Sequence, residues 1–269
     1  MEIFISLLII VIIYLVLLKM MNMRIRAVRA IFEDDSRRVP TAAEVNDLLK
    51  KAQADDSDAS RQLGDYYWRN NKKNPQYLEL SVKHYKKAAQ ADDPIALDAL
   101  GDIYYNNLFA EPDINMQEVG IEYFIKAAEL NMPSAIIELI YIYDDKIKEG
   151  EPLKEKKDYW AKKAIELAES GNVKMMLNLG LEVLTTEGSL ELDIDKELAA
   201  TWIEKAAMSG NAPAMIELGN MYKDGKVIEK NYKEAIIWYA KVVKEKGNIV
   251  LYKFPIGEAI RVYFAARKL

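Results

Sequence analysis

The chain has 269 residues, of which 51% are hydrophobic and 29% charged, enough to fold as one large domain or two ordinary ones. The absence of cysteine excludes disulfide frameworks, thiolate metal sites and cysteine nucleophiles, and a single histidine, His84, disfavours a Ser-His-Asp triad or a multi-histidine metal site. The net charge of −5 disfavours nucleic acid as the main ligand, which leaves an interaction protein or an enzyme that works with carboxylates alone.

The N-terminal segment is predicted to be a membrane anchor. Residues 3–18 form an uncharged run, and Met20, Met21 and Met23 extend it to about 21 residues, close to the length that spans a hydrocarbon core. A cleaved signal peptide would need a basic stretch before the run and a small-residue cleavage site after it, and neither is present. We therefore predict an uncleaved transmembrane signal-anchor helix over residues 1–23.

The charges around this run predict its orientation. No lysine or arginine precedes it, whereas a basic cluster follows it: Lys19, Arg24, Arg26 and Arg29. Because basic residues remain on the cytoplasmic side, we expect a single-pass protein with its N-terminus outside and the rest of the chain in the cytoplasm. The layout of one anchor followed by repeats suggests an inner-membrane protein of bacterial type. The same cluster either contacts anionic headgroups or only sets the topology.

Residues 24–40 read as a basic juxtamembrane linker that ends at Pro40. The next four residues, Thr41 to Glu44, form a capping-box motif, in which the Thr hydroxyl accepts a hydrogen bond from a backbone amide and the carboxylate reaches back. A helix is therefore predicted to begin there, and residues 41–58 are expected to cap the N-terminal end of the array that follows.

A repeat of 37 to 40 residues organises residues 59–248. Its first block has the form Ala-x-x-x-Leu-Gly-x-x-Tyr, whose helical spacing places the recurring residues on one face of a helix that we call the A helix. Its second block, on the B helix, has an aromatic place, two further residues, and Lys-Ala-Ala or a variant. The A-block leucines are Leu63, Leu100, Leu139, Leu179 and Leu218, and the B-block lysines are Lys87, Lys126, Lys163, Lys205 and Lys241.

The third and fourth copies depart from the pattern. Ile140 stands in the glycine place, Met175 in the alanine place, and Lys157 in the small-residue place that comes three residues before the aromatic one. About three extra residues also lie between Lys163 and Leu179. These departures bear on the local packing angle and leave the predicted helix pairs unchanged.

The two blocks together resemble the Sel-one-like repeat family, a relative of the tetratricopeptide repeats with a longer loop between helices A and B. The copy at residues 218–243 carries nearly the whole pattern. The resemblance implies an all-α, right-handed superhelical α-solenoid of about five helix-pair repeats, a concave face lined by A helices, and a role in protein–protein interaction. Residues 249–269 are expected to form a C-terminal cap, in which Phe254-Pro255 breaks the chain before a closing helix over residues 256–268.

By analogy with tetratricopeptide repeats, the concave face should present the residues two before, two after and five after each A-block leucine. Repeats one and two place charges with an aromatic edge there, and repeats three to five place mainly apolar residues. A partner segment, the chain's own C-terminal helix or tight winding of the solenoid could cover that apolar part. The predicted partner-binding residues are Arg61, Asp65, Trp68, Asp102, Tyr105, Ile137, Tyr141, Leu177, Leu181, Leu184, Ile216 and Asn220.

No motif indicates catalysis, a metal or a cofactor. His84 occupies the aromatic place of the first repeat and is interpreted as a packing residue. The acidic stretch at residues 55–58 lacks the glycine and the closing glutamate of a calcium loop, and acidic pairs in turns are typical of solvated surface.

The sequence therefore predicts a membrane-anchored, non-catalytic adaptor or scaffold that binds a peptide or an amphipathic helix of a protein partner on its concave face. An alternative is a periplasmic or secreted repeat protein in envelope assembly or host interaction. A more remote alternative is a hydrolase that uses the carboxylates Asp98 and Asp102.

Overall fold

The computed structural model describes residues 40–109, 114–185, 192, 194–246, 261, 262, 264, 265 and 268. The predicted anchor at residues 1–23, the linker as far as residue 39 and the basic cluster Lys19, Arg24, Arg26 and Arg29 lie outside these residues. Within the described part, no helix is both long and apolar enough to cross a membrane.

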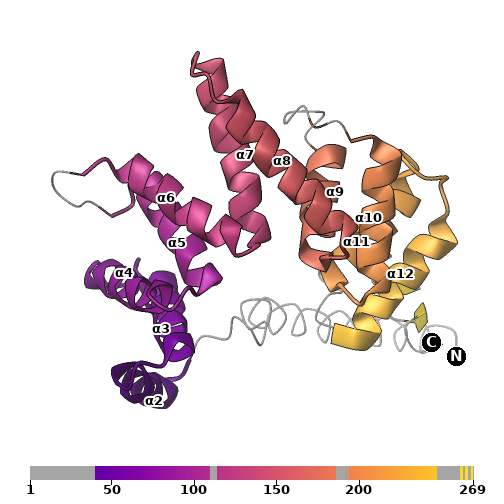
Figure 1. Cartoon of the computed structure of the whole chain (residues 1–269). Helices are drawn as coiled ribbons and strands as arrows, with labels where there is room; N and C mark the ends of the chain where they lie inside the picture. The colour runs from indigo at the N-terminus through magenta and orange to yellow at the C-terminus, as the bar shows by residue number, and fades with distance from the viewer. Residues whose placement is uncertain are drawn as a thin grey trace, which may run out of the picture. The chain divides into compact units, whose positions relative to one another are not determined.

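The described part of the chain is all-helical, as predicted, with eleven helices and no strand (Figure 1). It divides into two compact units, one holding the described residues up to 206 and the other those from 207 onward. The helices of the first unit are α2 (Ala42–Gln53), α3 (Ser57–Asn70), α4 (Gln76–Ala89), α5 (Pro94–Tyr105), α6 (Met116–Glu129), α7 (Pro133–Lys148), α8 (Lys154–Glu169), α9 (Val173–Thr185) and α10 (Lys196–Met208), which ends just past the division. The second unit contains α11 (Ala212–Asp224) and α12 (Tyr232–Lys246).

The helices occur as A–B pairs that follow the two sequence blocks. In the first unit α3 packs on α4, α5 on α6 and α7 on α8, and each B helix also contacts the A helix that follows it. Successive A helices contact each other directly, α3 with α5, α5 with α7 and α7 with α9. The A helices of this unit therefore form a continuous row.

The predicted capping box is present at the start of α2. The backbone N–H of Thr41 donates to Glu44 Oε2 at 2.6 Å, and the N–H of Glu44 donates to Thr41 Oγ1 at 3.4 Å. Helix α3 begins at Ser57, two residues before the predicted repeat, because the Asp56 carboxylate accepts from the N–H of Ala59 at 2.9 Å and caps the helix there.

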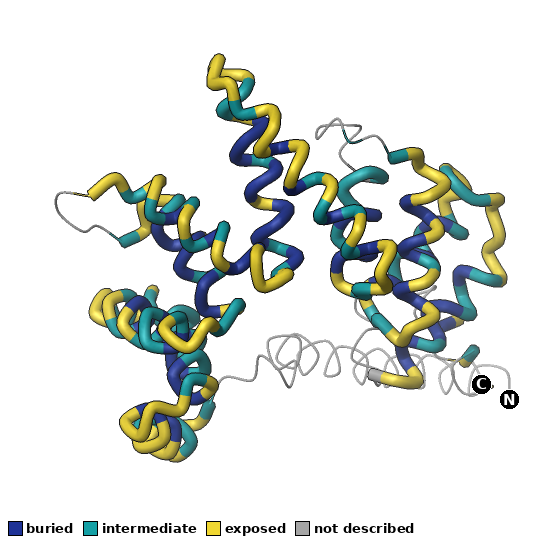
Figure 2. The backbone as a smooth tube through the Cα atoms, viewed as in Figure 1, coloured by how far each residue is buried: buried dark blue, intermediate teal, exposed yellow. Residues whose placement is uncertain are grey.

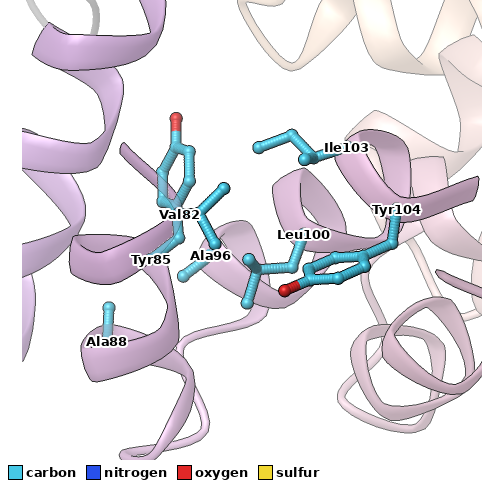
Figure 3. Close-up of a cluster of buried hydrophobic side chains, with 7 residues drawn as sticks. All are labelled: Val82, Tyr85, Ala88, Ala96, Leu100, Ile103 and Tyr104. Atoms are coloured by element: carbon cyan, nitrogen blue, oxygen red, sulfur yellow. The ribbon is translucent and has the colours of Figure 1, made fainter. Parts of the chain in front are cut away.

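Burial between neighbouring repeats holds the row together. Figure 3 shows one such cluster, in which side chains of α4 meet side chains of α5. Its members are all at most 3% exposed, and they are Val82, Tyr85, Ala88, Ala96, Leu100, Ile103 and Tyr104. In Figure 2 the buried residues run along the facing sides of the helices, and exposed residues mark outer faces and loops. Burying a large apolar side chain contributes about 1.5–3 kcal/mol, so these contacts between repeats stabilise both pairs.

Where glycine follows the A-block leucine, it allows the two helices of the pair to pack closely. A Cβ on Gly64 would lie 2.4 Å from the ring of Tyr85 on the B helix, and a Cβ on Gly101 would lie 2.5 Å from the ring of Phe124. Gly219 faces Tyr239 in the same way, at 2.2 Å. Since no side chain fits at such distances without a shift, glycine leaves the space that the B-helix ring fills.

The third pair exchanges large and small residues at this contact. Ile140, in the glycine place, is fully buried, and Ala161 stands in the B-helix place that Tyr85 and Phe124 occupy in the first two pairs. The extra residues predicted before Leu179 fall in α8, which has 16 residues, whereas α6 has 14. The departures from the repeat pattern thus still give a helix pair.

The lysine of the Lys-Ala-Ala block ties consecutive B helices together. Lys87 on α4 donates from Nζ to the carbonyl of Ala52 at the end of α2. Lys163 on α8 donates to the carbonyl of Ala128 at the end of α6, at 2.8 Å. The last carbonyls of a helix lack partners within the helix and carry partial negative charge, so each lysine caps the preceding B helix.

Replacing Lys163 with methionine is expected to lower the free energy of unfolding by about 1 kcal/mol, because the end of α6 loses a charged donor while the aliphatic stem is kept. Urea unfolding of the full chain in non-ionic detergent, followed by circular dichroism, measures this change. Lys162→Met is the matched control, since the Lys162 side chain is exposed and only loosely paired with Glu166, at 3.7 Å. An equal loss in both variants would contradict the capping role.

In the second unit, α12 packs on α11 and on the described part of the C-terminal segment. Val262 is fully buried against Ala235, Tyr239 and Val243 of α12. The apolar side of α12 is thus covered within its own unit.

Candidate interaction surface on the A helices

In the first repeat, the predicted partner-binding residues form contacts within the chain. Arg61 forms ion pairs with Asp58, with Asp65 at 3.0 Å and with Asp93 at 3.4 Å. Asp65 also accepts a hydrogen bond from the hydroxyl of Tyr85 at 2.8 Å. Trp68 lies half-buried against the cluster that α4 and α5 form.

In repeats one and two, the place two residues before the A-block leucine lies at the junction with the next repeat. Arg61 reaches Asp93, the N-cap of α5, and Asp98 reaches Ser134 in the first turn of α7. In repeats three and four this place holds Ile137 and Leu177, which are 7% and 8% exposed. Direct contact between successive A helices is the physical reason, so packing within the solenoid accounts for the burial of these two side chains.

The last repeat repeats the polar contact of the first one. Asn220 accepts from the hydroxyl of Tyr239 at 2.9 Å and donates to Glu217 at 3.1 Å. Ile216, like Leu181 and Leu184 in the fourth repeat, is half-buried.

A set of polar residues on α5, α7 and α9 forms a surface that we call the A face: Asp98, Asp102, Tyr105, Glu138, Tyr141 and Glu182. Ser134 Oγ donates to Asp98 Oδ2 at 2.7 Å and joins α5 to α7. The hydroxyl of Tyr141 donates to Glu182 and joins α7 to α9. The A face thus spans three successive repeats.

The carboxylates of the A face lie close enough to repel one another. Burial raises the pKa of Asp98 to about 7; the hydrogen bond from Ser134 opposes this rise, and the charges of Asp102 and Glu138 add to it. Partial burial also raises the pKa values of Asp102 and Glu138. The negative charges of Asp102 and Glu182 raise the pKa of Glu138 further. Among the described residues, no lysine or arginine forms an ion pair with Asp98, Asp102 or Glu138.

The pair Asp98 and Asp102 is poorly arranged for hydrolysis. One oxygen of Asp98 accepts from Ser134, and the other, Oδ1, is buried and has no hydrogen-bond partner in the described part of the structure. General acid–base catalysis needs a carboxylate oxygen within reach of the substrate, and both oxygens of Asp98 are held inside the packed helices. In the same described residues, no group of three or more acidic or histidine side chains could hold a metal ion.

His84 packs as an aromatic residue, as predicted. Its ring stacks on Tyr67 with a centroid distance of 5.6 Å and an interplanar angle of 18°. Its Nδ1 is buried and has no hydrogen-bond partner among the described residues. Burial, and then the charges of Lys83 and Lys87, lower the pKa of His84.

This lowered pKa predicts a pH-dependent loss of stability. Below about pH 6.5, the ordinary histidine pKa, the unfolded chain binds a proton that the folded chain still resists, so the stability contributed by neutral His84 falls with pH. In thermal melts of the full chain between pH 8 and 5, the melting temperature of His84→Phe should therefore rise relative to that of wild type as the pH falls. The raised pKa of Asp98 has the opposite effect, because the folded chain binds a proton there more readily than the unfolded chain does. The melting temperature of Asp98→Asn should therefore fall relative to that of wild type over the same pH range. A His84→Phe difference that stays constant with pH would contradict this assignment.

Helix pairs in a row, each burying its apolar side against its neighbours, define an α-solenoid of helix-pair repeats. The model of the Sel1 repeat matches residues 57–93, 94–132, 173–211 and 212–241, more than half of the sequence, and the chain belongs to the Sel1 repeat family. The pair α7–α8 lies between these matches, where Ile140 and Lys157 replace the usual small residues.

A solved structure shares the fold. The chain is similar to the Sel1 repeat protein from Oxalobacter formigenes, with 23% identity and a TM-score of 0.51 over 85% of this chain and 99% of that one. It is also similar to c5321, a protective antigen with an SLR fold from uropathogenic Escherichia coli (20% identity, TM-score 0.43, 86% of this chain and 56% of that one). A putative Sel1 repeat protein from Klebsiella pneumoniae subsp. pneumoniae has 20% identity and a TM-score of 0.43, over 78% of this chain and 97% of that one.

No curated protein matches the chain. Sel1 repeat proteins generally mediate protein–protein interactions, and their scaffolds are typically non-catalytic.

Proposed function

We propose that this protein is a membrane-tethered, non-catalytic adaptor that binds a protein partner on the A face. The observation that carries the proposal is the direct contact between α5, α7 and α9, which makes one surface from three repeats. Asp102 and Glu138 are exposed on it, and Tyr105 lies half-buried beside them. Repeat solenoids use such extended surfaces to hold a segment of another protein.

Site-specific photo-crosslinking in intact cells tests the binding surface. A photoreactive amino acid at Asp102 or Tyr105 is expected to give a discrete adduct with one partner. The matched control positions are Glu122 on α6 and Tyr159 on α8, which are exposed on B helices. Adducts that form at the control positions but not at the A face would refute the proposal.

The tether is supported by the uncharged run at residues 3–18 and the basic residues that follow it. We expect the full chain to remain with membranes after carbonate extraction, and a chain that lacks residues 1–23 to be released. A reporter that is active only in the periplasm, fused after Leu269, should be inactive, and a fluorescent protein that folds in the cytoplasm should be active there. The opposite reporter pattern would favour the alternative, a periplasmic or secreted repeat protein.

A further inference from the structure

The charge of the A face indicates what kind of partner it binds. We propose that the bound segment is cationic and places lysine or arginine side chains between Asp102 of α5 and Glu138 of α7. This inference rests on the proposed function and adds to it the chemistry of the partner.

Other carboxylates of the A helices are paired with cations of the same chain. Asp65 is paired with Arg61 at 3.0 Å, and Asp144 is paired with both Lys157 and Lys148. Asp102 and Glu138, by contrast, have no ion pair in the described part of the chain, although both are exposed and belong to neighbouring helices. Uncompensated negative charge therefore lies on two neighbouring helices of the row, α5 and α7.

A difference between B helices explains why Asp102 receives no hydrogen bond from the B helix of its own pair. The equivalent residue in repeat one, Asp65, accepts a hydrogen bond from the hydroxyl of Tyr85. The residue of α6 that corresponds to Tyr85 is Phe124, which has no hydroxyl to donate. Asp102 therefore keeps its acceptor oxygens for a ligand.

The mutual repulsion of these carboxylates favours a cationic ligand. After burial, the charge of Asp102 raises the pKa of Glu138, and the charges of Asp102 and Glu138 raise the pKa of Asp98, so each carboxylate opposes the ionisation of its neighbours. A cation placed between these carboxylates relieves this repulsion and gains Coulomb energy.

Tyr105 makes the site suitable for a side chain with an apolar stem. Burial raises the pKa of this half-buried residue; the charges of Asp145, Glu149 and, last, Glu138 raise it further, and that of Lys146 lowers it. Lysine and arginine combine a charged head with an apolar stem, and either head is attracted to a tyrosine ring. Nucleic acids and anionic lipid surfaces carry the wrong charge for this surface.

A designed peptide tests the inference. The probe is a fluorescent amphipathic helix of about 18 residues made of leucine and lysine, and its counterpart carries glutamate in place of lysine. Fluorescence anisotropy measures binding to the full chain in non-ionic detergent. Wild type should bind the lysine peptide, and Asp102→Lys with Glu138→Lys should weaken binding about tenfold or more.

The matched control makes the same change in net charge on a B helix, as Glu122→Lys with Glu129→Lys on α6, where both side chains are exposed. This control should change the affinity by less than about threefold, since only diffuse attraction is lost. The double lysine variant of the A face should also bind the glutamate peptide more tightly than wild type does. Equal losses in the two double variants, or no loss in either, would overturn the proposal.

Two further measurements separate the possible failures. If circular dichroism shows that the lysine variants unfold, Asp102→Asn with Glu138→Gln, compared with Glu122→Gln with Glu129→Gln, gives the same discrimination without charge reversal. If both pairs bind the lysine peptide as wild type does, the cationic partner is refuted. Photo-crosslinking at Tyr105 would still succeed in that case if the adaptor function is correct, so the two proposals fail independently.

Discussion

Replacing Asp144 with alanine is expected to destabilise the protein by about 3 kcal/mol, which is the largest effect of any single charged residue that we predict. The ammonium group of Lys157 donates to Asp144 Oδ1, and both side chains are buried between α7 and α8. Although burial opposes it, hydrogen bonds from Lys148 and Lys157 lower the pKa of Asp144, so the carboxylate is charged at neutral pH. Its removal leaves the Lys157 ammonium buried without a counter-ion.

Urea unfolding of the full chain, followed by circular dichroism, measures this loss. Adding Lys157→Met to Asp144→Ala should recover most of it, because a side chain of similar length then fills the site without charge. Asp145→Ala is the matched control, since Asp145 is exposed and lies 3.5 Å from Lys148 in a solvated pair. If the double variant were no more stable than Asp144→Ala alone, lost packing and not the unpaired charge would be responsible.

This ion pair also shows what the sequence could not reveal. Lys157 stands out as a departure from the repeat because a lysine replaces a small residue. Its partner Asp144 lies five places after the A-block leucine, at a position that the tetratricopeptide analogy assigns to the concave face. Only the three-dimensional contact between α7 and α8 identifies the two as a pair.

The repeat and its helices are predictable because their signals are local and periodic. The spacing of the A-block leucines fixes the number of pairs, and the capping box fixes the start of α2. The positions that face outward depend on the angle between successive A helices, which no single repeat encodes. Ile137 and Leu177 are buried for this reason, although the analogy places them on an open surface.

The sequence also contains a signal for the contact between the two helices of a pair, in the residue that follows the aromatic place of each B helix. That residue fills the space above glycine, as Tyr85 does over Gly64, and it becomes Ala161 in the one copy where isoleucine replaces glycine. Comparing the two places across the copies would have identified this contact. The same comparison would have shown that Asp102 lacks the hydroxyl partner of Asp65, because the B helix of the second repeat carries phenylalanine where that of the first carries tyrosine.

The second large effect is expected at Gly120, on the side of α6 that meets α5. A Cβ there would lie 2.4 Å from the backbone nitrogen and 2.7 Å from the Cα of Tyr105. A backbone cannot turn aside as a side chain can, so Gly120→Ala must push α5 and α6 apart. Overpacking of this kind costs up to about 3 kcal/mol, and alanine returns about 1 kcal/mol through its higher helix propensity, which leaves a net loss of about 2 kcal/mol.

Gly180→Ala on α9 is the control that separates overpacking from helix propensity. Its new Cβ would meet Ile203 Cγ1 at 2.7 Å, which is a side-chain atom that can rotate away, and the carbonyl oxygen of Ala199 at 3.0 Å. The same gain in propensity should then nearly cancel a smaller steric cost, and the urea midpoint should stay close to that of wild type. Because Tyr105 and Asp102 share the last turn of α5, a shift of that helix should also weaken binding of the lysine peptide to Gly120→Ala but not to Gly180→Ala. Equal stability of the two variants would mean that α5 and α6 are packed less closely than the structure shows.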